Sequence, residues 1–304
     1  MNWNDAAYVV DLLYWAHRAW HAVPADTRTP DGKPANMIHG VAGMLVKLLA
    51  NKDPCWLVFA ADVGGTTWRH ELYPAYKADR TPHPEGFDDQ LVQVARLLEL
   101  HRIPVVGVPG FEADDVATTL TSKFRRVGQR VILITADKDL NQLVTKEEPF
   151  VAIWDGRERR VNTRVIFEEF GVGPDRMGDL LALMGDTSDG VPGLRGIGKK
   201  TAATLLEGTT DLEDMLRLKM WSRNKVGRTL REGEHELRLW RKLVALRSDV
   251  PTDVRLGDCA VGSYDIEGLR AFYENVGLPM LANRLQRGSE KWAVPADMEA
   301  LWSR

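Results

Sequence analysis

The chain has 304 residues, of which 44% are apolar and 27% charged, and 40 basic against 43 acidic residues give a net charge of −3. This composition is typical of a folded globular protein and excludes a disordered, collagen-like or low-complexity chain. No apolar run approaches the roughly 18 residues of a membrane span, the N-terminus lacks a signal-peptide pattern, and two cysteines cannot build a disulfide framework or a cysteine-rich zinc site, so we expect a cytoplasmic protein without a membrane partner.

Three short apolar runs in the first half of the chain predict buried parallel strands, and an aspartate closely follows each one. The runs cover residues 8–10, 56–61 and 131–135, and their aspartates are Asp11, Asp62 and Asp137. Helical patterns at 37–50 and 87–101 lie between the runs, a further apolar run at 150–154 indicates another strand, and proline-bearing segments at 24–34 and 81–86 indicate exposed loops. Alternating strands and helices predict an α/β fold around a parallel sheet.

The pattern changes near residue 172, where strand signals fade and helical patterns broken by glycine begin. These helical patterns cover residues 174–184, 199–206, 212–220 and 233–246. We therefore predict an α/β domain over residues 1–172 and a mostly helical region over residues 173–304.

Carboxylates gather at the predicted strand ends and in two turns. The nine are Asp11, Asp62, Glu112, Asp114, Asp115, Asp137, Asp139, Asp186 and Asp189. A single aspartate after a strand is as readily a helix N-cap, and acids in a first helical turn are favoured by the helix dipole. Three strands ending in the same way, and three carboxylates within residues 112–115, instead favour a cation site at the carboxyl edge of the sheet. Oxygen ligands without histidine or cysteine suggest two Mg²⁺ or Mn²⁺ ions, the arrangement used for phosphodiester hydrolysis.

A glycine-rich segment at residues 191–202 predicts a phosphate-binding helix–hairpin–helix element. It is not a nucleotide-binding loop, because Lys200 stands where such a loop needs serine or threonine. Glycines allow close backbone approach to a phosphate, and the next helix offers free N–H groups beside Lys199 and Lys200. Residues 216–247 contain ten basic and three acidic residues, which indicates either a solvated helical surface or a phosphate-contacting one.

Three of these segments, in this order and spacing, give the chain a family resemblance. They are residues 112–115, 135–140 and 185–202, with weaker support from 10–22, 68–71 and 76–80. The chain resembles the 5′-nuclease or flap endonuclease family, which includes the 5′-nuclease domain of bacterial DNA polymerase I. The resemblance runs from Tyr8 to at least Leu206.

The resemblance implies a PIN-like parallel-sheet core with a C-terminal helical region that contains a helix–three-turn–helix module at about 174–208, and a helical arch at about 66–95 through which a single strand passes. The nine carboxylates fall on the family's metal-binding acids. The first ion would lie nearer Asp11, Asp62, Glu112, Asp114 and Asp115, and the second nearer Asp137, Asp139, Asp186 and Asp189. Lys77 and Arg80 match the arch's basic residues, and with Asp137 and Asp139 they are the implied catalytic group.

The resemblance also implies contacts to nucleic acid and to a monovalent ion. The implied DNA contacts are Arg18, Arg69, Tyr76, Lys77, Arg80, Arg195, Gly196, Gly198, Lys199 and Lys200. Backbone carbonyls of Met184, Pro192, Leu194 and Ile197 would hold K⁺. The expected protein is a stand-alone monomeric 5′–3′ exonuclease and flap endonuclease that cuts DNA to leave 5′-phosphates, and the family's RNA–DNA junctions are a further expected substrate.

Three positions depart from the family pattern without removing a carboxylate: Leu12, Gly190 and the Ala60-Ala61 pair before Asp62. The alternatives are an inactive DNA-junction-binding protein, a PIN-type ribonuclease and a Mg²⁺ phosphatase that uses Asp137 and Asp139. The phosphatase leaves residues 112–115 and the hairpin unexplained.

Overall fold

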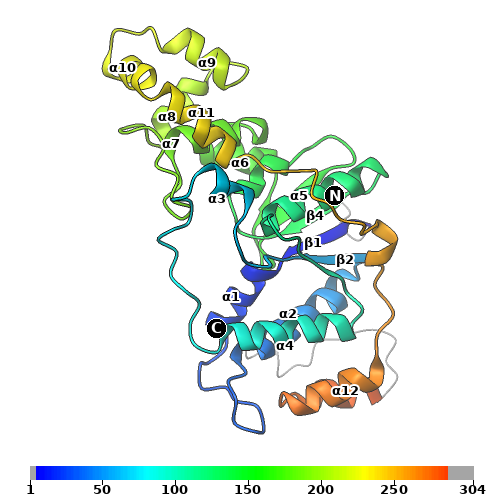
Figure 1. The fold of residues 1–304 in the computed structure, drawn as a ribbon. Coiled ribbons are helices and arrows are strands. Elements are labelled where there is room, and N and C mark those ends of the chain that lie inside the picture. The colour runs from blue at the N-terminus through cyan, green and yellow to red at the C-terminus, as the bar shows by residue number, and fades with distance from the viewer. Residues whose placement is uncertain (1–4, 287–304) are drawn as a thin grey trace.

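The computed structural model describes residues 5–286, and its centre is one six-stranded sheet (Figure 1). The strand order is β3-β2-β1-β4-β5-β6, and only β6 runs antiparallel to its neighbour. The strands are β1 (Ala7–Asp11), β2 (Trp56–Ala60), β3 (Val105–Val106), β4 (Val131–Ile134), β5 (Val151–Trp154) and β6 (Arg160–Val161). The parallel sheet and the strand at 150–154 are confirmed, whereas β3 and β6 have two residues each and left no pattern to recognise.

The central strand β1 is buried on both faces, which explains why its sequence is apolar without alternation. Tyr8 pairs with Leu57 and Ile132, and this layer packs into one core cluster. Val9 pairs with Val58 and Leu133, and this layer packs into the other.

Helices cover both faces of the sheet. The Tyr8 side is covered by α1 (Leu12–Ala22), α2 (Asn36–Lys52), α4 (Phe87–Leu100) and α12 (Ile266–Asn275), while α5 (Ala113–Arg126) and α6 (Thr163–Phe170) cover the Val9 side. The predicted helices at 37–50 and 87–101 are therefore confirmed. None of the described helices combines the length and apolarity that crossing a membrane requires.

A second group of helices extends from the sheet (Figure 1). It contains α7 (Met177–Met184), α8 (Lys199–Leu206), α9 (Leu212–Lys219), α10 (Lys225–Glu232) and α11 (Glu234–Leu243). Four of these helices agree with the predicted helical segments, whereas α10 was not predicted. Its apolar residues share one core cluster with the sheet, and α12 returns to pack against α4. The division into 1–172 and 173–304 stays a prediction, and residues 287–304 of that second region lie outside the described residues.

The predicted helical arch at 66–95 has helix only at its two ends. The helix α3 (Trp68–Leu72) lies at the first end and α4 begins near the second, while residues 73–86 form turns and irregular chain. Pro74, Pro82 and Pro84 lack the N–H group that a continuing helix needs, which accounts for the difference.

Candidate active site

The carboxyl ends of β1, β2 and β4 place Asp11, Asp62 and Asp137 around one cavity of about 530 Å³. Glu112, Asp114 and Asp189 line the same cavity. Lys77, Arg80 and the residues of the 81–84 segment also line it. The sheet edge therefore brings together acids that are far apart in the sequence, as the strand pattern predicts.

Asp11 caps helix α1 and faces the cavity at once. Its Oδ1 accepts the Tyr14 N–H at 3.0 Å, and its Oδ2 accepts the Thr135 hydroxyl at 3.2 Å. Burial is the main cause that raises the pKa of Asp11 to about 6; the hydrogen bonds from Tyr14 and Thr135 oppose the rise, and the charges of Asp137 and Asp62 add to it. The helix-cap interpretation is thus correct for Asp11, and the cap does not remove its carboxylate from the acidic group.

Glu112 stands at the N-terminus of α5, where three donors meet it. Arg69 Nη1 lies 3.0 Å from Glu112 Oε2, and Lys77 Nζ lies 3.1 Å from Oε1. The Tyr76 hydroxyl lies 3.0 Å from Glu112 Oε2 and 2.9 Å from Asp189 Oδ2, and so links two carboxylates through one proton.

Asp115 is fully buried and both of its oxygens are occupied by donors. Arg69 binds it through Nη1 at 2.8 Å and Nη2 at 2.9 Å, while Trp68 Nε1 and the Arg247 N–H each donate to it at 2.9 Å. The carboxylate faces this buried arginine, and it does not line the cavity that the other acids share.

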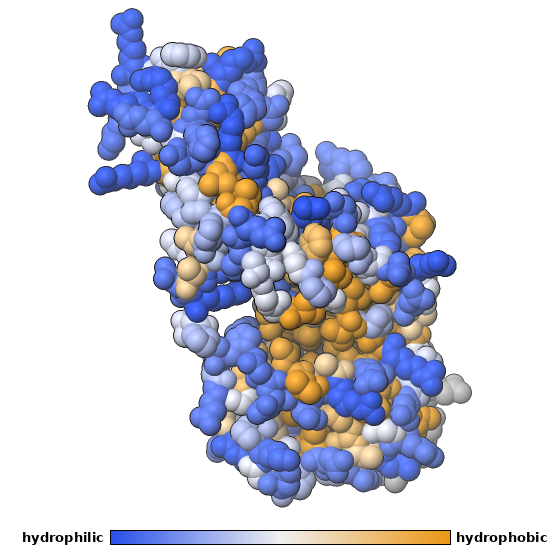
Figure 2. Space-filling view, viewed as in Figure 1, coloured by the Kyte–Doolittle hydropathy of each residue, from blue (hydrophilic) through white to orange (hydrophobic). Residues whose placement is uncertain are grey.

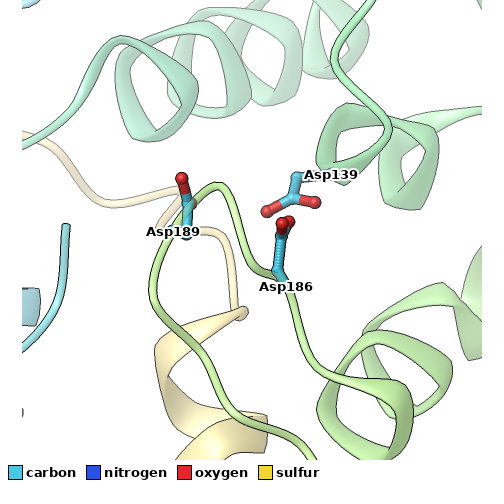
Figure 3. Close-up of side chains that lie close together, drawn as sticks. All are labelled: Asp139, Asp186 and Asp189. Atoms are coloured by element: carbon cyan, nitrogen blue, oxygen red, sulfur yellow. The ribbon is translucent and has the colours of Figure 1, made fainter. Parts of the chain in front are cut away.

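Asp139, Asp186 and Asp189 form the tightest acidic group in the described residues. One oxygen from each lies within 4.8 Å of the others (Figure 3). Asp139 begins the short helix η1 (Asp139–Leu143), and the other two lie in the turn after α7. The Oδ1 atom of Asp139 is buried without a hydrogen-bond partner. Leaving a carboxylate oxygen buried and unpaired is unfavourable, so this oxygen fits a bound cation.

Repulsion between neighbouring carboxylates also affects their pKa values. Burial, together with the charges of neighbouring aspartates, holds the pKa values of Asp114 and Asp139 well above their usual range. Asp186 differs: burial alone would raise its pKa, but hydrogen bonds from Lys138 and Ser188 lower it. Lys138 Nζ lies 2.6 Å from Asp186 Oδ2, a neutralising contact that the sequence interpretation missed although Lys138 stands between two acids.

The structure buries two of the predicted DNA contacts among the carboxylates. Arg69 is 3% exposed and Tyr76 is 2% exposed, and their contact with DNA stays a prediction. Arg69 connects the acids to the chain after α11, through the carbonyls of Leu243 at 2.8 Å and Ala245 at 2.9 Å. Arg18 is half-buried and donates to the carbonyls of Asp155 and Gly156 at 2.7 and 3.3 Å, which anchors the loop after β5; its DNA contact stays a prediction.

The predicted phosphate-binding hairpin lies between α7 and α8. Gly196 has a φ of +80° and Gly198 caps α8, while Arg195, Lys199 and Lys200 are exposed. The hairpin's first turn contacts the 73–86 segment, because the Lys77 N–H donates to the Asp189 carbonyl at 3.0 Å.

The residues predicted to hold K⁺ lie around the same hairpin. Met184 and Pro192 line an open cavity of about 430 Å³, and the Leu194 carbonyl accepts the Ile197 N–H at 3.0 Å. The K⁺ site stays a prediction.

Comparisons with known proteins agree with this geometry. Residues 6–171 match the family model described as 5′–3′ exonuclease, N-terminal resolvase-like domain, and residues 172–267 match 5′–3′ exonuclease, C-terminal SAM fold. The chain is 37% identical to a thermostable DNA polymerase I of Thermus filiformis over 88% of this chain and 32% of that protein. It is 35% identical to DNA polymerase I of Rhizobium leguminosarum over 94% of this chain and 29% of that protein, so it spans about a third of these relatives.

Solved structures show the same fold at lower identity. The D15 flap endonuclease of bacteriophage T5, in a complex with DNA and metal ions, matches with a TM-score of 0.66 at 21% identity, covering 92% of this chain and 98% of that one. The catalytic core of Rad2 with a DNA substrate matches with a TM-score of 0.62 at 19% identity, covering 93% and 91%.

Proposed function

The chain belongs to the 5′–3′ exonuclease family, whose two models together match residues 6–267, and from this premise we propose that it is a structure-specific 5′ nuclease. It hydrolyses DNA phosphodiester bonds where single-stranded DNA joins a duplex, including 5′ flaps, and leaves 5′-phosphates. The reaction requires Mg²⁺ or Mn²⁺.

The unpartnered Asp139 oxygen beside Asp186 and Asp189 is the observation that carries this proposal. The acids of the cavity repel one another in the metal-free protein. Oxygen atoms clustered in this way are the ligands that hard divalent cations prefer. Eight of the nine predicted acids fit that role. Asp115 is better explained as a positioning residue, because its oxygens already accept hydrogen bonds from Arg69, Trp68 and Arg247.

We assign the eight carboxylates to two ions. Asp11, Asp62, Glu112 and Asp114 would hold one ion, and Asp137, Asp139, Asp186 and Asp189 the other. Divalent ions held there would acidify a water molecule and stabilise the leaving 3′-oxygen. Lys77 and Arg80, which line the same cavity as the acids, would bind the scissile phosphate and offset the negative charge that develops on it.

The hairpin supports the choice of substrate. Exposed Lys199 and Lys200 stand with the N-terminus of α8 after Gly198, a combination that binds a phosphate backbone without reading its sequence. A K⁺ ion held by hairpin carbonyls would add to that contact. Binding should weaken steeply with salt, because phosphate contacts dominate.

The deciding experiment uses a duplex with a 5′ single-stranded flap, labelled at its 3′ end, with Mg²⁺ or with EDTA. Cleavage at the junction in Mg²⁺ alone is expected, and Asp137→Asn should abolish cleavage while DNA binding survives. Binding without cleavage in both Mg²⁺ and Mn²⁺ would identify a junction-binding protein. Cleavage restricted to an RNA strand of the same design would identify a ribonuclease.

A further inference from the structure

The turn between α9 and α10 exposes a tryptophan. Trp221 is 72% exposed, the largest exposed fraction among the large apolar side chains of the described residues. Its removal would leave no cavity in the core. A single exposed apolar side chain is ordinary on a protein surface, so the charges near this indole in the sequence decide what it can bind.

The surroundings of Trp221 are strongly basic. Residues 215–231 contain six lysines and arginines and no acid. Arg217 pairs with Asp214, and Arg231 donates to the carbonyls of Met220 and Ser222. The other four cations form no ion pair among the side chains that the structure describes, residues 5–283: Lys219, Arg223, Lys225 and Arg228. Figure 2 shows hydrophilic side chains covering this end of the molecule.

Unpaired cations close in sequence to one exposed aromatic ring match the chemistry of nucleic acid, which presents phosphates beside sugar and base surfaces. An apolar protein partner would need a broader apolar patch, and a purely acidic one would leave the indole unused. We propose that Trp221 and these four cations form a second DNA contact, which binds the duplex arm beyond the hairpin. This inference rests on the proposed function and adds a distal anchor to it.

The structure holds this anchor at a fixed distance from the acids. Arg238 of α11 binds Glu213 of α9 through two bonds of 2.8 and 2.7 Å, and Arg241 of α11 binds Asp179 of α7 at 2.6 Å. The C-terminal end of α11 meets Arg69, which contacts Glu112. The ten residues of α11 span about 15 Å and the eight of α10 about 12 Å, so the turn lies at most roughly 27 Å from the C-terminal end of α11.

That spacing predicts how the contact depends on the DNA. At about 3.4 Å per base pair, up to roughly 8 base pairs of duplex would separate the junction from Trp221. A short arm would reach the hairpin alone, whereas a long arm would reach both contacts.

The test measures dissociation constants by fluorescence anisotropy in EDTA, for the full chain and duplexes with arms of about 4 and about 20 base pairs. Trp221→Ala is expected to weaken binding of the long arm about 10-fold and to leave the short arm unchanged. Val92→Ala, which alters another exposed apolar side chain on α4, is the matched control and should change neither. A paired Lys225→Gln and Arg228→Gln variant should reduce the salt slope by about 2 on the long arm only.

Flap cleavage by the unmodified chain is measured in parallel in Mg²⁺. If it cleaves but Trp221→Ala binds both arms as tightly as the parent, the distal anchor is wrong and the proposed function stands. Equal weakening on single-stranded DNA of the same length would also overturn a duplex contact. If the unmodified chain neither binds nor cleaves, the proposed function itself fails, and the anchor fails with it.

Discussion

Arg69 donates to both oxygens of Asp115, with N–O distances of 2.8 and 2.9 Å, and both side chains are buried. The guanidinium also bonds the carbonyls of Leu243 and Ala245, so one ion pair connects α3, α5 and the chain after α11. A bidentate pair of this kind fixes geometry as well as charge.

Replacing this arginine should therefore destabilise the whole fold. Arg69→Met leaves Asp115 buried without its partner, and we expect a loss of about 3–5 kcal/mol in the free energy of unfolding. Urea unfolding in EDTA measures it, with no dependence on catalysis. Arg164→Met, which breaks the exposed pair with Glu168, is the control and should change little. Equal stability of the two variants would show that the buried pair does not hold these elements together.

Replacing Asp139, whose Oδ1 atom has no hydrogen-bond partner, should stabilise the metal-free protein and not destabilise it. Asp139→Asn removes one charge from a crowded group, so the metal-free protein is expected to gain about 1 kcal/mol or more of stability. The same variant should lose the stabilisation that Mg²⁺ gives the parent chain. Melting temperatures with EDTA and with Mg²⁺ measure both effects, and Asp253→Asn at an exposed position is the control. A metal-free Asp139→Asn protein less stable than its parent would contradict the repulsion.

Stability without metal should fall as pH rises from about 4 to about 6. The pKa of Asp11 is about 6 in the folded protein, above its value of 3.8 in an unfolded chain. Between these values the unfolded chain has released a proton that the folded protein still holds, so a rise in pH favours unfolding. Melting temperatures in EDTA across this interval measure the slope, which Asp11→Asn should flatten. Mg²⁺ should stabilise the protein more at pH 7.5 than at pH 5, because protons compete for the same oxygens. Equal Mg²⁺ shifts at both pH values would argue against ligation by these carboxylates.

Lys77 should act on the reaction more than on the fold. Burial alone would lower the pKa of its ammonium, but Glu112 and Asp189 raise it, so the group stays charged beside the cavity. Lys77→Ala is expected to slow single-turnover flap cleavage about 100-fold, while DNA affinity changes far less. Lys146→Ala, remote from the cavity, is the control. An unchanged cleavage rate would remove Lys77 from the proposed mechanism.

The sequence predicted the acidic edge because strand ends and carboxylates are local features. Asp11, Asp62 and Asp137 each follow an apolar run, and parallel strands bring such ends together. Which individual polar residues are buried could not be predicted from such local features. Arg69 and Tyr76 look like surface DNA contacts in the chain, and only the tertiary structure encloses them against Glu112.

The conformation of the predicted arch was also not predicted correctly from the family resemblance. The family resemblance implied a helix there, while Pro74, Pro82 and Pro84 locally oppose one, and the proline effect decided the conformation of residues 73–86. Asp115 resembles its neighbour Asp114 in sequence, yet one faces Arg69 and the other the cavity. Residues one position apart on a helix point about 100° apart, and only packing determines which of them meets which surface.

The hairpin offers a final comparison between two glycines with similar backbones. Gly193 and Gly196 have φ values of +64° and +80°, so alanine at either position pays backbone strain. At Gly193 an added Cβ would also lie 2.7 Å from Gly185 Cα, whereas at Gly196 it would meet nothing within 4 Å. Gly193→Ala should therefore displace the turn that holds Asp186, and weaken both Mg²⁺ binding and flap cleavage at least about 10-fold. Gly196→Ala should keep the Mg²⁺ affinity, since its cost is confined to the exposed hairpin. Calorimetric Mg²⁺ titration of both variants checks the difference. Matching losses in the two would mean that hairpin conformation in general, and not the close approach of Gly193 to Gly185, positions Asp186 in the acidic group.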